Sequence, residues 1–267
     1  MIKAALKKLL SESTRARLRR AEQLAFLPFR VGSAVDCPCC GLSFRHFLHF
    51  YGEGNVRCPY CNSLPRQRFQ AALLRDLRKF ELRHDRILHV AAEFSLNLFL
   101  RRIAAKNRLR LDSLQSFIPG MCVRPDVVGD LRQLEFPSGS FKLIICNHVL
   151  EHIEEDRTAI KEIYRVLSDD GFALVTVPVR GAGLQTLEES WINSDELRTQ
   201  HYGSPTHVRM YGADVTRRFA EAGFAVDVKR PSQMLPDVQI ARQRLVPDEP
   251  HFFLTKRSDE SAAAPHE

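Results

Sequence analysis

From about residue 84 onward, short apolar runs alternate with stretches whose apolar residues recur at helical spacing. The runs are rich in the Val, Ile, Leu and Phe residues that favour strands. They fall at residues 86–91, 109–114, 126–128, 142–146, 172–177, 224–228 and 252–254. Residues 141–146 are apolar at almost every position, which predicts a central strand buried on both faces. Because strand, helix and strand follow one another repeatedly, we expect an α/β fold with a mostly parallel sheet.

Helical stripes lie between the predicted strands. Residues 160–167 place four apolar side chains on one helix face, and we expect this helix to end at 168–171 with Gly171 in the left-handed conformation of a cap. Residues 214–222 predict a further helix. The polar, alanine-rich residues 258–267 predict a disordered tail.

Residues 1–30 predict a basic amphipathic helix. Such a helix either attaches to an anionic membrane surface or nucleic acid backbone, or packs on its own domain with its basic side in water. Residues 1–86 hold 17 basic and 7 acidic side chains, whereas residues 87–267 hold 22 and 25, so the N-terminal third is the part suited to an anionic partner. No apolar run in the sequence approaches the ~18 residues of a transmembrane segment. We expect a cytoplasmic protein, either free or peripheral to the membrane.

Five of the seven cysteines lie within residues 37–61. Two C-x-x-C pairs, Cys37 with Cys40 and Cys58 with Cys61, are separated by 17 residues, a spacing typical of a tetrathiolate zinc ribbon. Cys39 is an alternative ligand to Cys37, although the spacing favours Cys37. Four thiolates close the coordination sphere, so we expect a structural Zn²⁺ ion and not a catalytic one.

Residues 31–62 are therefore predicted to form a zinc-ribbon module, and residues 63–83, with Ser63 and Pro65 as start signals, a connecting helix. Cationic and aromatic residues near the cysteines are Arg45, His46, His49, Tyr51, Arg57, Arg66 and Arg68. Such a surface grips nucleic acid in some proteins, but it serves equally well as a lid or a docking surface.

The most informative stretches are the one that contains the predicted central strand and the one that leads into the next strand. Residues 130–153 read DLRQLEFPSGSFKLIICNHVLEHI, and residues 163–178 read IYRVLSDDGFALVTVP. In order and spacing these segments resemble class I S-adenosylmethionine-dependent methyltransferases. Two details differ, because Lys142 stands where the family has Asp, and residues 169–171 (Asp-Asp-Gly) replace its Pro-Gly-Gly turn.

The first predicted strand, residues 86–94, reads RILHVAAEF and lacks the glycine-rich signature of the family. It is similar to a bacterial branch whose first motif reads Leu-His-Val-Ala-Pro-Glu, with Ala92 in place of Pro, and which carries a two-knuckle cysteine module and an Arg-rich helix before that motif. The resemblance implies a Rossmann-like methyltransferase sheet with seven strands over residues 84–257. It also implies S-adenosylmethionine as the cofactor.

A nucleoside cofactor needs small residues where the backbone approaches it, and Ala91 and Ala92 supply them. Glu93 either faces the ammonium group of the methionine part or caps the next helix. The resemblance implies that Asp130 accepts a hydrogen bond from the adenine amine and that the Leu131 amide meets a ring nitrogen. The predicted cofactor contacts are Ala91, Ala92, Glu93, Ser116, Asp130, Leu131, Asn147 and His148.

The ribose is the weak point of this prediction. The family's acidic residue after its second strand has no clear counterpart, because Gln115 or Ser116 occupies that region and Asp112 comes a few residues early. A dinucleotide-binding alternative is set aside, because no G-x-G-x-x-G follows Val90.

Three histidines are candidates for the catalytic base, since a free imidazole titrates closest to neutral pH. His148 and His152 follow the central strand at the edge where open α/β sheets bind ligands. Each is equally compatible with a structural role, His148 in capping the turn and His152 in packing at a helix start. The third candidate is His207.

His207 opens the segment His-Val-Arg-Met-Tyr, which resembles an acceptor-pocket segment of the same branch. His207, Arg209 and Tyr211 alternate, so on an extended chain they project to one side. An arginine there suits an acceptor that bears a carboxylate or a phosphate, and we expect Arg209 and Tyr211 to bind the acceptor. Residues 181–203 are expected to form a lid.

The sequence thus predicts a methyltransferase that acts on an unidentified acceptor, with a hydroxyl of a small molecule or saccharide favoured. The alternative is a zinc-ribbon protein that binds nucleic acid or an anionic membrane and carries a degenerate, inactive methyltransferase-like domain.

Overall fold

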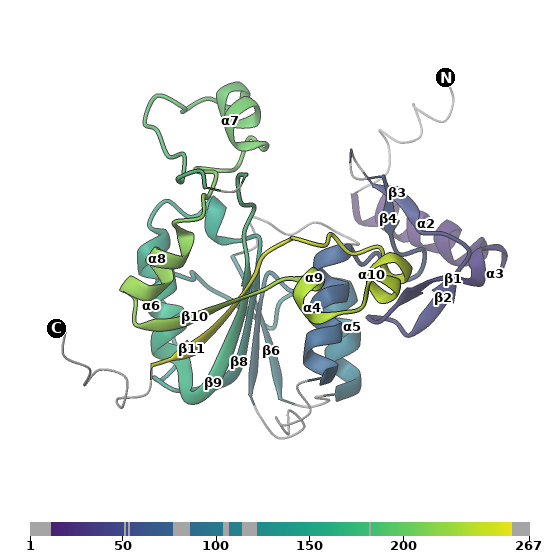
Figure 1. The fold of residues 1–267 in the computed structure, drawn as a ribbon, viewed down its shortest axis with the longest axis horizontal. Helices are drawn as coiled ribbons and strands as arrows, with labels where there is room; N and C mark the ends of the chain where they lie inside the picture. Colours follow the sequence, from purple (N-terminus) through teal and green to yellow (C-terminus); the bar gives the residue numbers. More distant parts are fainter. Residues whose placement is uncertain are drawn as a thin grey trace.

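The computed structural model describes residues 12–50, 52, 54–76, 86–103, 107–113, 122–181 and 183–257. These residues form a large sheet with helices on both faces and a small N-terminal module beside it (Figure 1). The first part of the predicted basic helix (1–11), the end of the connecting helix (77–83) and the tail (258–267) lie outside the described residues. None of the described helices is long and apolar enough to span a bilayer.

The large sheet has seven strands in the order β10-β11-β9-β8-β5-β6-β7. The strands are β5 (Ile87–Val90), β6 (Arg108–Asp112), β7 (Val127–Val128), β8 (Phe141–Asn147), β9 (Leu167–Thr176), β10 (Phe224–Lys229) and β11 (His251–Lys256). Neighbours from β7 to β9 pair in parallel, and β11 runs antiparallel to both β9 and β10. The predicted Rossmann-like, mostly parallel sheet of seven strands is confirmed.

The side chains of β8 alternate between two apolar layers. Ile144 and Cys146 pack with the helices α6 (Asp156–Val166) and α8 (Val215–Glu221). Leu143 and Ile145 pack on the opposite face with α4 (Pro65–Asp76) and α5 (Phe94–Ile103). All four side chains have no exposed surface, as the apolar run predicted. Two covered faces fix the register of β8, because a slip of one residue would exchange the layers.

The N-terminal module consists of two antiparallel hairpins that carry four of the cysteines at their ends. Its strands are β1 (Val31–Cys37), β2 (Leu42–Phe44), β3 (Leu48–Phe50) and β4 (Gly54–Arg57), preceded by α2 (Glu12–Ala25) and α3 (Leu27–Arg30). The amide of Gln23 on α2 donates to Asn62 Oδ1 at 3.0 Å, and the Arg20 guanidinium lies 5.1 Å from the centre of the Tyr60 ring. The described part of the basic helix thus packs on its own module.

Arg68 joins the module to the rest of the chain. Its guanidinium donates to the carbonyls of Val56 and Ser63 in the module at 2.8 and 2.7 Å. It also donates to the carbonyls of Gln243 and Arg244 at 2.6 and 3.0 Å. These two residues lie at the end of α10 (Asp237–Gln243), which follows the short helix α9 (Pro231–Met234). Arg68 has no exposed surface. Of the cationic residues named as a candidate surface, Arg68 is therefore excluded, because its guanidinium is buried and bonded to backbone carbonyls.

The prediction of a left-handed cap at Gly171 is also wrong. Strand β9 begins at Leu167, directly after α6, and Gly171 is not among the glycines with positive φ. A Cβ at this position would lie 2.8 Å from the carbonyl oxygen of Lys142 and 2.7 Å from Ser168 Oγ. Glycine is required here by the close approach of β8 and not by the backbone conformation.

Candidate active site and metal centre

A cavity of about 1060 Å³ opens at the carboxyl ends of β5, β6 and β8. The end next to β5, β6 and β7 is lined by Val90, Ala91, Glu93, Leu111, Asp112, Ser113, Val128, Gly129, Asp130, Leu131 and Arg132. The other end is lined by His148, Val149, His152, Ile153, Glu154, Asp195, Arg198, Pro205, Thr206 and Val208. This is the edge where open α/β sheets bind their ligands.

Asp130 lies at the edge of the cavity with its carboxylate half exposed. The Arg132 guanidinium donates to both carboxylate oxygens, at 3.0 and 2.6 Å, and the Arg132 amide donates at 2.8 Å. These hydrogen bonds lower the pKa of Asp130, so it is ionised. Arg132 is held in turn by Glu155 at 2.5 Å. Leu131, between the two, is buried and lines the cavity.

Asp112 is the last residue of β6, which is two residues shorter at its end than the sequence pattern predicted. Its side chain is buried and lines the cavity beside Asp130. The end of the second parallel strand therefore carries a carboxylate, and the prediction that Asp112 comes too early for this position is wrong. Ser116, predicted to serve instead, lies outside the described residues.

Ala91 forms the turn after β5, with a positive φ of 46°. A small side chain suits this backbone, since bulky or branched residues are strained there. The Ala91 amide donates to the carbonyl of Leu111 at 2.8 Å, which fixes the turn against β6. Ala91 lines the cavity, whereas Ala92 is buried and does not appear in its lining.

Glu93 lies on the floor of the cavity and is surrounded by hydrogen-bonding partners. His89 Nε2 lies 2.8 Å from one carboxylate oxygen, Gln67 Nε2 donates to the other at 3.1 Å, and Arg66 lies 4.0 Å away. Burial acts to raise the pKa of Glu93, but the contact with His89 and the charge of Arg66 outweigh burial and hold the pKa at about 2. Glu93 is therefore a carboxylate that faces the cavity.

Asn147, at the end of β8, links the sheet to helix α4. It exchanges two hydrogen bonds of 2.8 Å with Gln70, and its amide also reaches Glu93 at 3.2 Å. With Thr176 donating to its oxygen at 2.9 Å, the Asn147 side chain is buried and fully engaged. These hydrogen bonds of Asn147 thus hold this part of the cavity wall in place.

His148 follows β8 with a positive φ of 52°, an uncommon conformation for a residue with a side chain. Its imidazole lies in the cavity wall, and Nδ1 is 3.3 Å from Oε1 of Glu151. Glu151 belongs to the short helix η1 (Leu150–His152) and has no exposed surface. Burial acts to raise the pKa of Glu151, yet the adjacent His148 imidazole outweighs it and the pKa is lowered.

His152 and His207 are 55 positions apart in sequence and meet in space. Their rings pack edge to face with centroids 4.8 Å apart. His152 lines the cavity, and His207 lies directly behind the lining residues Thr206 and Val208. Burial lowers the pKa of His207, which favours its neutral form.

Arg209 and Tyr211 belong to the same segment as His207, but their side chains are buried in the protein interior. Arg209 is 1% exposed, donates to the carbonyls of Leu150 and Glu154 at 3.0 and 2.7 Å, and pairs with Glu188 at 2.5 Å. Tyr211, without exposed surface, donates to Asp156 at 2.7 Å. Burial and the Asp156 carboxylate raise the pKa of Tyr211, so the phenol stays protonated.

Neither Arg209 nor Tyr211 is among the described residues that line the cavity. Their predicted role in binding the acceptor does not fit this geometry. Alternation correctly indicated that the three side chains share a side, but that side packs on η1 and α6.

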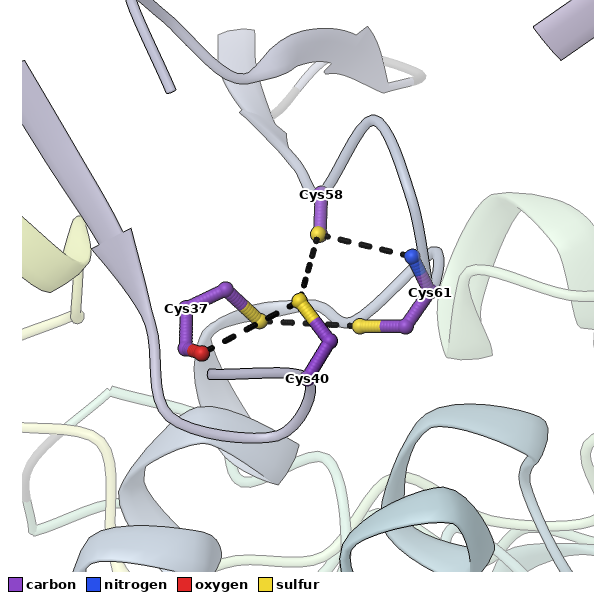
Figure 2. A group of neighbouring side chains, drawn as sticks. All are labelled: Cys37, Cys40, Cys58 and Cys61. Carbon is purple, nitrogen blue, oxygen red and sulfur yellow. Dashed lines mark hydrogen bonds between the residues drawn. The ribbon is translucent and has the colours of Figure 1, made fainter. Parts of the chain in front are cut away.

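The four predicted ligands Cys37, Cys40, Cys58 and Cys61 come together in the module, with their sulfur atoms directed at one another (Figure 2). The sulfur atoms are 3.5 Å apart between Cys37 and Cys61 and 3.8 Å apart between Cys40 and Cys58. Four sulfurs at Zn–S distances of about 2.3 Å from one ion lie roughly 3.8 Å from each other, so the arrangement fits tetrahedral Zn²⁺.

Cys39 lies outside this group, because its thiol donates to the carbonyl of Gln67 at 3.3 Å. The alternative in which Cys39 replaces Cys37 is therefore not supported. Gly41 has a φ of 74° and donates to the carbonyl of Cys37 at 2.7 Å, so it closes the first knuckle.

Two parts of the cavity wall lie outside the residues that the sequence singled out as cofactor or acceptor contacts. The module and α4 contribute Cys61, Asn62, Leu64, Arg66 and Gln67. The segment 181–203, expected to be a lid, contains the helix α7 (Asp195–Tyr202), which stands beyond one edge of the sheet and contributes Asp195 and Arg198 (Figure 1). Helical periodicity predicts a helix but not which neighbour it faces, so no sequence signal identified these contacts.

Residues 102–175 match the family described as the methyltransferase domain. The chain is similar in structure to the YcgJ protein of Bacillus subtilis, at 15% identity over 70% of this chain and 98% of that one, with a TM-score of 0.47. It is also similar to an S-adenosylmethionine-dependent methyltransferase of Mesorhizobium loti, at 18% identity over 69% and 95% of the two chains, with a TM-score of 0.48.

No curated protein matches the chain. The family match spans strands β6 to β9, which carry Asp112, Asp130, His148 and η1 around the cavity. The part of the chain from β6 to β9 is therefore similar to a methyltransferase domain.

Proposed function

We propose that the protein transfers the methyl group of S-adenosylmethionine to a hydroxyl oxygen of a small molecule or saccharide. The observation that carries this proposal is one cavity with two chemically different ends. Carboxylates and small residues line the end at β5, β6 and β7, whereas the end beneath α7 carries two imidazoles beside its carboxylates. A cofactor and an acceptor can therefore meet in the same enclosed space.

The residues at the first end fit the parts of the cofactor. The buried carboxylate of Asp112 suits the two ribose hydroxyls, and the Asp130 carboxylate with the Leu131 amide suits the adenine edge. Glu93 is an ionised group suited to the methionine ammonium, and Ala91 leaves room for the backbone to approach. When bound, S-adenosylmethionine supplies a methyl group on a sulfonium, which leaves as a neutral thioether.

At the second end, His148 is the best candidate for the general base. Its imidazole is accessible from the cavity, and the Glu151 carboxylate at 3.3 Å stabilises the imidazolium that forms when the acceptor hydroxyl loses its proton. His152 and His207 complete this end. Arg209 and Tyr211 act as positioning residues, because they hold η1 and the start of α6.

The test is methyl transfer by the full-length protein from methyl-labelled S-adenosylmethionine to a panel of monosaccharides and small phenols. His148→Gln should lower kcat by about a hundredfold or more and leave the affinity for S-adenosylhomocysteine unchanged. His46→Gln, at an exposed histidine of the module, is the matched control. Transfer that persists in His148→Gln would remove His148 from the mechanism. A wild-type protein that binds no cofactor would favour the alternative of an inactive methyltransferase-like domain.

We propose that the tetrathiolate cluster binds one structural Zn²⁺ ion. The support is the burial of all four ligands and sulfur separations that suit a tetrahedron. Since Cys61 also lines the cavity, the ion holds one wall of the active site in shape.

We propose further that the module contacts an anionic membrane surface. Exposed apolar side chains gather where α2 meets β1: Phe29 is 74% exposed, and Phe26 and Val31 are each 50% exposed. Aromatic side chains of this kind suit the headgroup region, and the basic excess of the N-terminal third supplies the attraction to anionic lipid.

A further inference from the structure

We propose that Glu151, His152 and His207 form a second metal site, which binds a divalent transition-metal ion at the acceptor end of the cavity. One ligand atom from each of these residues lies within 4.8 Å of the other two. Ligands at about 2.1 Å from one ion lie up to roughly 4 Å apart, so small side-chain rotations close the site. Two imidazoles and one carboxylate are a donor set used by zinc and iron(II) sites with open positions.

The carboxylate of Glu151 is the first independent observation. Glu151 has no exposed surface, and neither of its oxygens accepts a hydrogen bond from the residues that the structure describes. The nearest partner is Nδ1 of His148, 3.3 Å from one oxygen. His148 approaches only one of the two buried oxygens, so a cation beside the carboxylate would stabilise it further.

The imidazole orientations are the second observation. His152 Nδ1 lies 3.1 Å from the carbonyl oxygen of Thr206, and His207 Nδ1 lies 2.9 Å from that of Tyr202. A carbonyl oxygen only accepts, so each Nδ1 is the hydrogen-bond donor, and Nε2 is the nitrogen left for a metal ion. This is the arrangement found in metal-binding histidines, whose second nitrogen is held by a backbone carbonyl.

The backbone around the three ligands is pre-organised. The Val208 amide donates to the carbonyl of Glu151 at 2.9 Å, which joins the segment of His207 directly to η1. Arg209, buried behind them, holds the carbonyls of Leu150 and Glu154. Because these bonds fix the backbone, ion binding does not require the two segments to be brought together.

Three protein ligands leave coordination positions open, and His152 faces the cavity. Resting on the proposed function, the ion would hold the acceptor oxygen and lower its pKa. The hydroxyl proton then passes to His148, an oxygen–carbon bond forms to the methyl group, and the carbon–sulfur bond breaks with its electron pair on sulfur. The ion is not consumed, because it changes neither charge nor oxidation state.

Manganese(II) is a selective probe for this site, because the thiolate cluster prefers softer ions. Purified full-length protein is titrated with Mn²⁺ alone, without cofactor or acceptor, and the free ion is followed by electron paramagnetic resonance. We expect one bound Mn²⁺ per chain. Glu151→Gln and His207→Asn should each weaken binding by about tenfold or more, whereas His201→Asn on α7 should not.

Folding of each variant is checked by its zinc content and by its affinity for S-adenosylhomocysteine, which should match wild type. Wild-type protein that binds no Mn²⁺, or two folded variants that bind it as well as wild type, would overturn the proposal. Since the titration contains no cofactor, its failure leaves the methyltransferase function standing. Conversely, a protein that shows no methyl transfer but binds one Mn²⁺ ion per chain leaves the metal site standing.

Discussion

Two clusters of side chains that could hold a metal ion border the same cavity, and they differ in how they are enclosed. The tetrathiolate cluster is buried on all sides and each ligand faces the other three (Figure 2). In the cluster of Glu151, His152 and His207, Glu151 is buried, whereas His152 lines the cavity and leaves the cluster open on that side. A closed cluster can only stabilise structure, whereas an open one can take part in chemistry. Sequence spacing identifies the first kind, and only the fold assembles the second.

The largest expected effect tests the closed cluster. Cys58→Ser should abolish zinc binding and unfold the hairpins of residues 31–62, because metal binding supplies on the order of 10 kcal/mol of folding free energy in small zinc modules. Cys39→Ser, which removes a thiol outside the cluster, should keep one zinc per chain. Metal analysis and limited proteolysis measure both outcomes. Equal zinc content in the two variants would contradict the assignment of ligands.

The next effect tests the framework behind the open cluster. Arg209→Ala should lower the free energy of unfolding by about 2–5 kcal/mol, because truncation leaves the carbonyls of Leu150 and Glu154 without this hydrogen-bond donor. Arg157→Ala, at an exposed pair with Glu221, should behave as wild type in the same urea titration. A mild effect at Arg209 would show that η1 is held by other contacts.

Glu93 lies between the module and the sheet, and its effect depends on pH. Its folded pKa of about 2 lies below its ordinary value of 4.5, so its contribution is present above pH 5 and is lost as the pH falls toward 2. Glu93→Gln should therefore cost up to about 3 kcal/mol at pH 7, and the difference from wild type should shrink on acidification. Urea titrations at pH 7 and pH 3.5 measure this. A difference independent of pH would contradict the assigned charge state.

The smallest effect concerns the outer face of the module. Phe29→Ser should reduce binding to vesicles that contain anionic lipid by about tenfold, since burial of a phenylalanine contributes about 1.5–3 kcal/mol. Flotation with neutral vesicles is the control, and both proteins should stay unbound there. Vesicle binding that is unchanged by Phe29→Ser would remove this surface from the account.

The sequence predicted the sheet well because a strand that is buried on both faces is apolar at nearly every position, as β8 is. It also predicted which four cysteines come together, since each C-x-x-C knuckle is local in sequence. It misjudged Asp112 because the strand was extended by two residues, and strand ends carry little apolar signal. It misjudged Arg209 because alternation tells which side chains share a side, but not whether that side meets a ligand or the core.

The missing pieces of the site depend on contacts between distant segments. The wall from α4 and the meeting of His152 with His207 arise when separate elements pack, and no local pattern encodes them. Glu151 is similar, because in sequence it is one more residue of a family motif. Its burial without hydrogen bonds among the described residues becomes visible only in three dimensions.

The central claim is that the cavity binds the nucleoside of S-adenosylmethionine with Asp112 at its ribose. Isothermal titration calorimetry of the full-length protein with S-adenosylhomocysteine tests this claim most directly. The Asp112→Asn variant is compared with Asp195→Asn, which changes a residue at the opposite end of the cavity. We predict one binding site per chain, weakened by about tenfold or more in Asp112→Asn and unchanged in Asp195→Asn. Absence of heat with the wild type, or equal affinity in all three proteins, would contradict the account.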